Sequence, residues 1–141
     1  MYWRILLFCA SVGVVLTGCA QPVTQATPAA AGWTSGPITD EATYRREIVG
    51  RPLTNTSDNF VSSGMILPDG TMTVETRRRV GDAIYNRMTG TWRFENGQAC
   101  RDLTVVEGSS NAVPSECQSV AKTGDEATFT GSRGSSVWKV G

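Results

Sequence analysis

Gly90-Thr91-Trp92-Arg93-Phe94-Glu95-Asn96-Gly97-Gln98-Ala99-Cys100 is the stretch of this chain that predicts the fold most directly. Trp92 and Phe94 alternate with Arg93 and Glu95, as in a strand that buries one face and exposes the other. The Asn-Gly pair that follows is the strongest short signal for a two-residue hairpin turn. We therefore predict two antiparallel strands joined at Asn96 and Gly97.

The exact length of this turn decides which face of the sheet carries Cys100. A two-residue turn pairs Arg93 with Cys100 and places the cysteine on the outer face. A three-residue turn with Gly97 as a bulge pairs Trp92 with Cys100 and places it inside. A slip of one residue moves every side chain to the other face. Asn-Gly statistics favour the first arrangement.

Short candidate strands separated by turn signals continue on both sides of this hairpin. The strongest turns are Pro68-Asp69-Gly70 and Asn96-Gly97, and residues 124–125 and 133–134 form weaker ones. The predicted strands are 52–55, 60–67, 71–77, 83–88, 91–95, 98–106, 118–123, 127–130 and 136–140. Connections this short make neighbouring strands antiparallel. We predict an all-β, up-and-down meander that closes into a small barrel, because closure removes exposed strand edges. A two-sheet sandwich is the alternative.

One short helix is predicted before the strands, over residues 39–49. Thr39 or Asp40 can cap it, and Gly50 and Pro52 end it. Tyr44 and Ile48 are four residues apart and share a face. We expect this helix to plug one end of the sheet.

Four large aromatic residues alternate with polar neighbours and predict a buried sheet face: Trp92, Phe94, Phe129 and Trp138. In a small barrel such rings fill the interior, and function then lies on loops such as 77–82 and 131–135. In a wider barrel the same rings would line a cavity for an apolar or amphipathic ligand. We expect filling.

The N-terminus carries a targeting signal. Arg4 precedes about a dozen mostly apolar residues, too few to span a bilayer. Leu16-Thr17-Gly18-Cys19 follows and resembles the bacterial lipobox. That resemblance implies lipid transfer to the Cys19 sulfur, cleavage after Gly18 and acylation of the new amine. Ala20, which is not acidic, implies sorting to the outer membrane, with the domain facing the periplasm.

The domain organisation follows from this signal. Residues 1–18 are the predicted signal peptide, and 19–37 are the lipidated cysteine with a flexible tether rich in Pro, Ala, Thr and Gln. The β-meander domain is expected over 38–141.

We expect different fates for the four cysteines of the chain. Cys9 leaves with the signal and Cys19 carries lipid. Cys100 and Cys117 remain as an even pair in an oxidising envelope, so we predict that they form a disulfide. No metal site is expected, because the remaining thiols are bridged.

The hairpin and the cysteines carry a second resemblance, over roughly residues 50–141. The motif consists of Gly90, Trp92, Cys100, Cys117 and a Gly124-Asp125 turn. It resembles small secreted proteobacterial proteins of unknown function that are built as meanders with one disulfide. The resemblance implies a fold and an envelope location, and no activity.

Composition argues against two classes of function. Thirteen basic and 13 acidic residues leave no basic field for a nucleic acid. The absence of histidine removes His-based triads and His metal ligands. A Ser-Lys dyad from Ser135 or Ser136 with Lys139 or Lys122 is conceivable, but no catalytic motif surrounds it. We expect no enzyme and no cofactor.

Two loops are candidate interaction sites. Arg77, Arg78 and Arg79 form the densest charge, either a solvated strand end near Asp82 or a surface for anionic lipid. Ser132 and Arg133 lie in a turn that resembles a loop of membrane-bound lysozyme-inhibitor lipoproteins, although motif order and a following aromatic differ.

These observations predict a lipid-anchored accessory protein of the cell envelope that contacts an envelope protein or the cell wall through loops. An inhibitor of a wall-degrading enzyme and a carrier of a small ligand are the alternatives.

Overall fold

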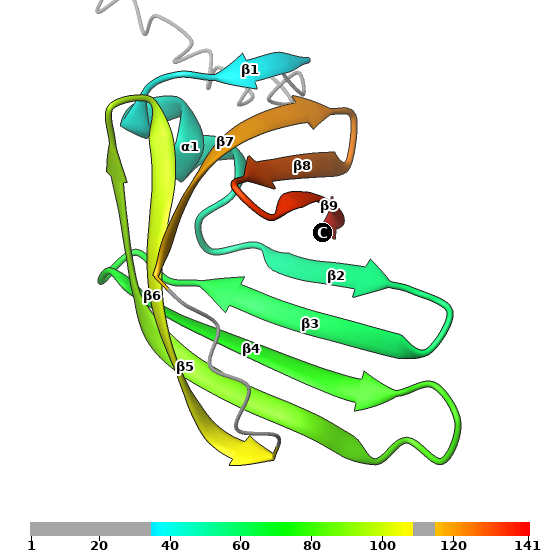
Figure 1. Cartoon of the computed structure of the whole chain (residues 1–141). Helices are drawn as coiled ribbons and strands as arrows, with labels where there is room; N and C mark the ends of the chain where they lie inside the picture. The colour runs from blue at the N-terminus through cyan, green and yellow to red at the C-terminus, as the bar shows by residue number, and fades with distance from the viewer. Residues whose placement is uncertain (1–34, 109–114) are drawn as a thin grey trace, which may run out of the picture. The chain divides into compact units, whose positions relative to one another are not determined.

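The computed structural model describes residues 35–108 and 115–141 of the chain (Figure 1). The predicted signal peptide, Cys19 and most of the tether lie outside the described residues. The elements in chain order are β1 (Gly36–Ile38), α1 (Glu41–Glu47), β2 (Pro52–Thr56), β3 (Phe60–Ile66), β4 (Thr71–Arg78), β5 (Ile84–Glu95), β6 (Gln98–Gly108), β7 (Glu116–Thr123), β8 (Glu126–Gly131) and β9 (Gly134–Val140). Within the described residues, no helix is long and apolar enough to cross a membrane.

The strands form one closed antiparallel barrel. Their order is β7-β6-β5-β4-β3-β2-β9-β8, and β8 pairs again with β7. β1 pairs with β7 as an additional strand outside this circle. The prediction of a small meander barrel is confirmed, and the alternative of a two-sheet sandwich is wrong. In Figure 1, β7, β8 and β9 complete the wall above the long sheet of β2 to β6.

The β5–β6 hairpin has the register favoured by its turn. Arg93 pairs with Cys100, Phe94 with Ala99 and Glu95 with Gln98. Asn96 and Gly97 both have positive φ, 52° and 75°, as a type I′ turn requires. The three-residue alternative is therefore wrong, and Cys100 lies on the outer face.

Two predicted boundaries need correction. Residues 83–88 and 91–95 form the single strand β5, which runs through Gly90 without a break. A Cβ at Gly90 would lie 1.8 Å from the Asp102 carbonyl oxygen, so this glycine marks a close approach between two backbones. Gly36 and Pro37, expected in the tether, belong to β1. Pro37 fits there because an edge strand does not need every N–H group.

The predicted helix is shorter than expected, and its cap is Asp40. The Asp40 side chain accepts a hydrogen bond of 2.8 Å from the Thr43 N–H. Tyr44 is 1% exposed and packs against Trp92 and Phe94, with ring centroids 5.4 and 5.1 Å away. The helix covers the core at these rings, as its apolar face predicted.

A buried ion pair fastens α1 to the barrel wall. Lys122 of β7 is fully buried, and its Nζ lies 3.8 Å from Oε2 of Glu47, which is 3% exposed. Lys122 also donates to the Gly124 carbonyl. Burial lowers the pKa of Lys122, and the nearby Glu47 carboxylate opposes that shift.

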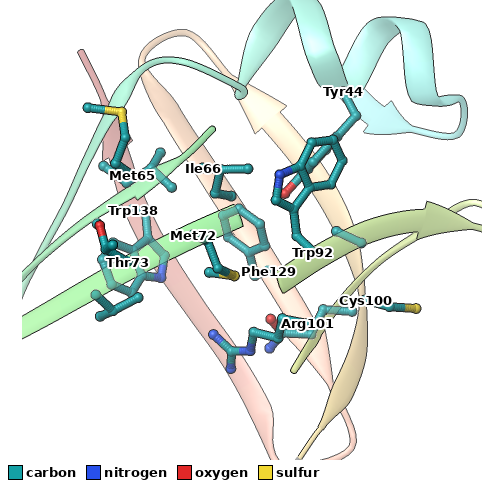
Figure 2. Close-up of a pocket in the computed structure, with 15 residues that line it drawn as sticks. Tyr44, Met65, Ile66, Met72, Thr73, Trp92, Cys100, Arg101, Phe129 and Trp138 are labelled. Atoms are coloured by element: carbon teal, nitrogen blue, oxygen red, sulfur yellow. The ribbon is translucent and has the colours of Figure 1, made fainter. Parts of the chain in front are cut away.

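The barrel interior next to α1 is filled with side chains (Figure 2). Trp92 and Phe129 are buried, and Phe94 and Trp138 are partly buried against the same core. The Trp92 Nε1–H donates to the Leu67 carbonyl at 2.7 Å. The cavity among these side chains measures about 40 Å³, enough for one or two water molecules. This agrees with the expectation of a packed interior.

Candidate functional site

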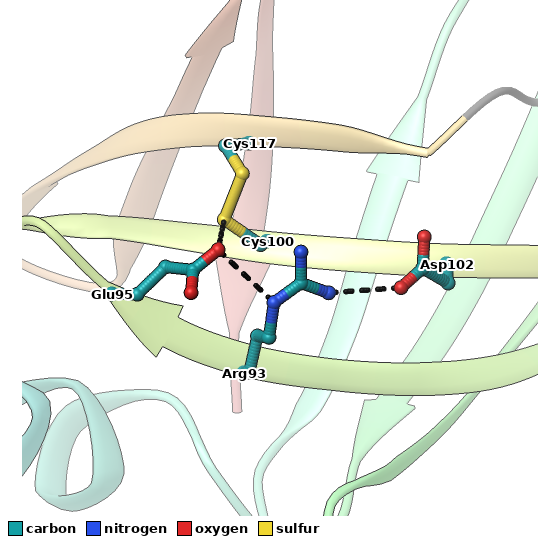
Figure 3. The surroundings of a disulfide bond; sticks show 5 residues. All are labelled: Arg93, Glu95, Cys100, Asp102 and Cys117. Carbon is teal, nitrogen blue, oxygen red and sulfur yellow. Dashed lines mark hydrogen bonds and ion pairs between the residues drawn. A yellow bond between two sulfur atoms is a disulfide. The ribbon is translucent and has the colours of Figure 1, made fainter.

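The predicted disulfide is present between Cys100 of β6 and Cys117 of β7 (Figure 3). The two residues are direct cross-strand partners, with Cα atoms 3.9 Å apart. Arg93 lies beside them and forms ion pairs with Glu95 at 3.0 Å and Asp102 at 2.9 Å. All three of these charged side chains are about half exposed, so the pairs contribute little to stability.

The disulfide also bears on metal binding. Among the described residues, the one group of three potential ligands is Glu95 with Cys100 and Cys117. Glu95 Oε1 lies 3.4 Å from the Cys100 sulfur. Both sulfurs are joined to one another, so neither is a thiolate that could bind an ion.

An oppositely charged pair lies on the inner face, next to the disulfide. Arg101 pairs with Trp92 on one side and with Glu116 on the other, and Trp92 points into the core. In Figure 2 the Arg101 side chain extends away from the Cys100 sulfur. Arg101 and Glu116 are the last pair of the β6–β7 ladder at this end, where β7 begins, and β6 continues to Gly108 paired with β5.

The β8–β9 turn completes a hollow at this point. Arg133 Nη2 lies 3.2 Å and Arg101 Nη2 lies 3.4 Å from Oε2 of Glu116. The Ser132 hydroxyl lies 3.4 Å from Oε1 of the same carboxylate. The hollow has a volume of about 250 Å³. We name the residues that line it the mouth. These residues are Arg101, Glu116, Gln118, Arg133, Gly134, Ser135 and Ser136.

The electrostatics of the mouth centre on Glu116, whose side chain is 7% exposed. Burial raises the pKa of this carboxyl, but the neighbouring Arg133 and Arg101 outweigh burial and lower it overall. Glu116 is therefore ionised at neutral pH. Two guanidinium groups facing one carboxylate leave the mouth with a single excess positive charge.

The second predicted site, Arg77 to Arg79, has partners of its own. Arg77 Nε lies 2.6 Å from Glu75 Oε1, and its Nη1 lies 3.4 Å from Asp82 Oδ2. Hydrogen bonds from Arg87 and Arg77 lower the pKa of Glu75. Arg79 donates to the Ser57 carbonyl at 3.4 Å. Arg77 of the triple-arginine run thus belongs to an ion-pair network with Glu75 and Asp82.

Beyond this network, the β4–β5 turn presents an exposed apolar tip. Val80 is 90% exposed. A hollow of about 490 Å³ lies beside it, lined by Asp58, Asn59, Phe60, Arg78 and Val80. The Arg78 guanidinium lies 5.7 Å from the ring centroid of Tyr85, which packs 4.7 Å from the Phe60 ring. We name these five lining residues, together with Arg79 and Tyr85, the tip surface.

The Ser-Lys pairs that the sequence offered have other partners. Lys122 pairs with Glu47, and the Ser135 hydroxyl lies 2.8 Å from that of Thr130. Ser136 accepts a hydrogen bond from the Trp138 Nε1–H at 3.1 Å. Lys139 is exposed, and Glu126 is its cross-strand neighbour in the β8–β9 ladder. These contacts do not place an activated lysine beside either serine.

Sequence reasoning named Arg133 and Ser132 but missed Arg101 and Glu116, which form most of the mouth. A signal for them was present. Arg101 follows the first cysteine of the disulfide and Glu116 precedes the second. If the cysteines pair on one face of antiparallel strands, these two neighbours must face each other on the opposite one.

Comparison with known proteins gives no match: none is found among family models, curated proteins or solved structures. The functional argument therefore rests on the geometry of this chain.

Proposed function

We propose that this protein is a non-catalytic binding module of the cell envelope, held at a membrane by lipid on Cys19, which contacts a protein partner through the tip surface. The proposal combines the lipobox at residues 16–19 with one structural observation. That observation is the exposed tip surface on a barrel whose interior is already packed.

The packed interior favours contact through the surface over transport of a ligand inside. A cavity of about 40 Å³ has no room for a lipid or an amphipathic envelope molecule without repacking Trp92, Phe129 and Met72. The end of the barrel next to α1 is covered by Tyr44, which is buried and packs against Trp92. A carrier would need an enclosed volume several times larger.

The tip surface has the composition of a protein contact. Aromatic residues and arginine are enriched in protein interfaces, and Phe60, Tyr85 and Arg78 are stacked together here. Val80 beside them is almost fully exposed. An apolar side chain next to a solvent-filled hollow gains most by burial against a partner.

The inhibitor alternative has less support from the geometry. The resemblance to lysozyme-inhibitor lipoproteins implies that the Ser132–Arg133 loop of this chain contacts the enzyme. Here the turn spans only two residues between Gly131 and Gly134, and both side chains contact Glu116. A turn directed back at its own domain is poorly placed to enter an enzyme cleft.

The anchor is tested separately from the contact. Cys19→Ser should leave an unprocessed precursor in the cell, and the wild-type chain should carry diacylglycerol on its first residue. Mass spectrometry of the mature N-terminus checks this. An unmodified terminus at another residue would refute the anchor.

The contact is tested by site-specific photo-crosslinking of the full chain in cells. A photoreactive residue at position 80 should join the chain to one protein, and adding the double change Arg78→Glu/Arg79→Glu should abolish that product. The same residue at position 96, in the turn at the other end of the strands, is the matched control. Equal crosslinking from position 96, or products with lipid alone, would contradict the proposal.

A further inference from the structure

The mouth contains a buried hydrogen-bond donor with no partner. The Arg101 Nε–H is inaccessible to solvent and has no hydrogen-bond partner among the described residues. The guanidinium meets Glu116 only through Nη2, at 3.4 Å. Leaving a buried donor unpaired costs free energy, so a buried donor without a partner in the chain calls for a bound water, ion or ligand.

The geometry of that donor indicates the kind of partner. Nε–H and one terminal N–H of a guanidinium point in the same direction and form a fork that matches two oxygens of one planar anion. Glu116 contacts one nitrogen of this guanidinium, Nη2, at the long distance of 3.4 Å, and leaves Nε–H without an acceptor. An acceptor with two oxygens would satisfy Nε–H once a small movement of the Arg101 side chain brings it to the hollow.

The charge of the mouth indicates the charge of that partner. Arg101 and Arg133 carry two positive charges against the one negative charge of Glu116. A singly charged anion balances this excess, whereas a phosphate dianion would add repulsion from the buried Glu116 carboxylate. A carboxylate group satisfies both the fork and the charge.

The hollow has room for such a group beside Glu116. A Cβ at Gly131 would lie 2.1 Å from Oε1 of Glu116, so glycine at this position lets the Glu116 carboxylate lie against the backbone. The hollow of about 250 Å³ is smaller than a typical pocket for a drug-sized ligand. It accommodates one small acid or the end of a chain, and Gln118 and Ser136 add polar groups to its wall.

We infer that the mouth is a binding site for a carboxylate, with Arg101 as the bidentate donor and Arg133 as the second cation. The carboxylate comes from a small free acid or from the C-terminus of a peptide. Arg133 lies on an exposed turn and can shift from Glu116 to the ligand, while Glu116 keeps Arg101 oriented. This site is separate from the tip surface, so either proposal can fail without the other.

Calorimetric titration of the purified full chain tests the inference with four probes: acetate, N-acetyl-Ala-Ala, its C-terminal amide and inorganic phosphate. Acetate or the peptide acid should bind saturably, and the amide should bind at least about tenfold more weakly, because it lacks the charge that the fork recognises. Equal affinity for acetate and the peptide identifies free acids as ligands, and a preference for the peptide identifies chain ends. Tighter binding of phosphate, or equal binding of the amide, would overturn the assignment.

Variants locate the binding within the chain. Arg101→Gln should weaken binding of the carboxylate probes at least about tenfold, and Arg101→Lys should lose most of it despite keeping the charge, since lysine has no fork. Arg93→Gln, on the outer face of the same hairpin, is the matched control and should bind as wild type does. If the Arg101 variants do not fold, the binding site is tested by Arg133→Gln and by comparing the affinities of the peptide acid and its amide. Undiminished binding in Arg101→Lys and Arg133→Gln would refute the site.

Discussion

Arg101 and Glu116 are direct cross-strand partners on the inner face of the barrel, one residue from the disulfide that joins the same two strands on the outer face. This is the last pair of the β6–β7 ladder, because β7 begins at Glu116. The covalent bond therefore fixes the distance between the two strands at the point where the mouth opens. Stability and the geometry of the proposed site are linked through Cys100 and Cys117.

The first prediction concerns this disulfide. The double variant Cys100→Ser/Cys117→Ser should lose about 3 kcal/mol of unfolding free energy, because the bond closes a loop across a sequence separation of 17. Urea unfolding without reductant measures the loss, and Ser119→Ala, at an exposed position of β7, is the control. An unchanged midpoint would contradict the prediction, as would two titratable thiols in the native unreduced protein.

The second prediction concerns the buried pair under α1. Glu47→Gln should cost about 3–5 kcal/mol, because it removes the buried carboxylate that faces the buried Lys122 ammonium. Glu41→Gln is the matched control on the same helix. Its partner Arg45 is 47% exposed, so we expect a loss of only about 0.5 kcal/mol.

A double replacement separates pairing from packing at this site. Glu47→Leu/Lys122→Met should recover most of the stability lost in Glu47→Gln, because two apolar side chains carry no desolvation cost. Chemical unfolding at neutral pH gives all of these values. Similar losses for Glu47→Gln and Glu41→Gln would show that the buried pair contributes no more than an exposed one.

The third prediction is a pH dependence at Glu116. Its pKa is lowered in the folded protein, so its contribution to stability is present above its unfolded value of 4.5 and is lost as the pH falls through the folded value. Glu116→Gln should therefore be less stable than wild type at pH 7, and the difference should shrink below about pH 4.5.

Unfolding free energies of both proteins between pH 7 and pH 3 test this. Glu75 and Asp102 also have lowered pKa values and lose stability in the same range. Both groups are present in the variant and in wild type, so their effect cancels in the comparison. A constant gap between the two proteins across the range would show that Glu116 has no such role.

The fourth prediction concerns the close approach at Gly90. Gly90→Ala places a methyl group 1.8 Å from the Asp102 carbonyl oxygen and must push β5 away from β6, so we expect a loss of about 1–3 kcal/mol or more. Gly64→Ala is the comparison, since its Cβ would lie 3.2 Å from the Thr73 carbonyl oxygen. Thermal unfolding should rank Gly90→Ala as the more damaging change, and the reverse order would be incompatible with this structure.

Much of the architecture was determined by the sequence alone, where the information is local. The Asn96-Gly97 turn and the alternation of Trp92 to Glu95 predict the hairpin register, because turn type and a period of two both act between near neighbours. The same reasoning predicts the antiparallel meander. For Cys100 it favours the outer face but leaves the inner face as an alternative, and the observed register decides between them. The even number of cysteines left after processing, and the oxidising compartment expected for them, predicted the bond between Cys100 and Cys117.

Other features were decided only by tertiary structure, because they depend on contacts between distant strands. Gly90 resembles a break in sequence but allows close backbone packing in the barrel. β1 has three residues and no usable periodicity, and only its pairing with β7 defines it. The barrel closes where β2 pairs with β9, which joins residues 53–54 to residues 139–140, and no local pattern contains that contact. The mouth also needs the assembled barrel, because Arg101, Glu116 and Ser136 come from three different strands, β6, β7 and β9.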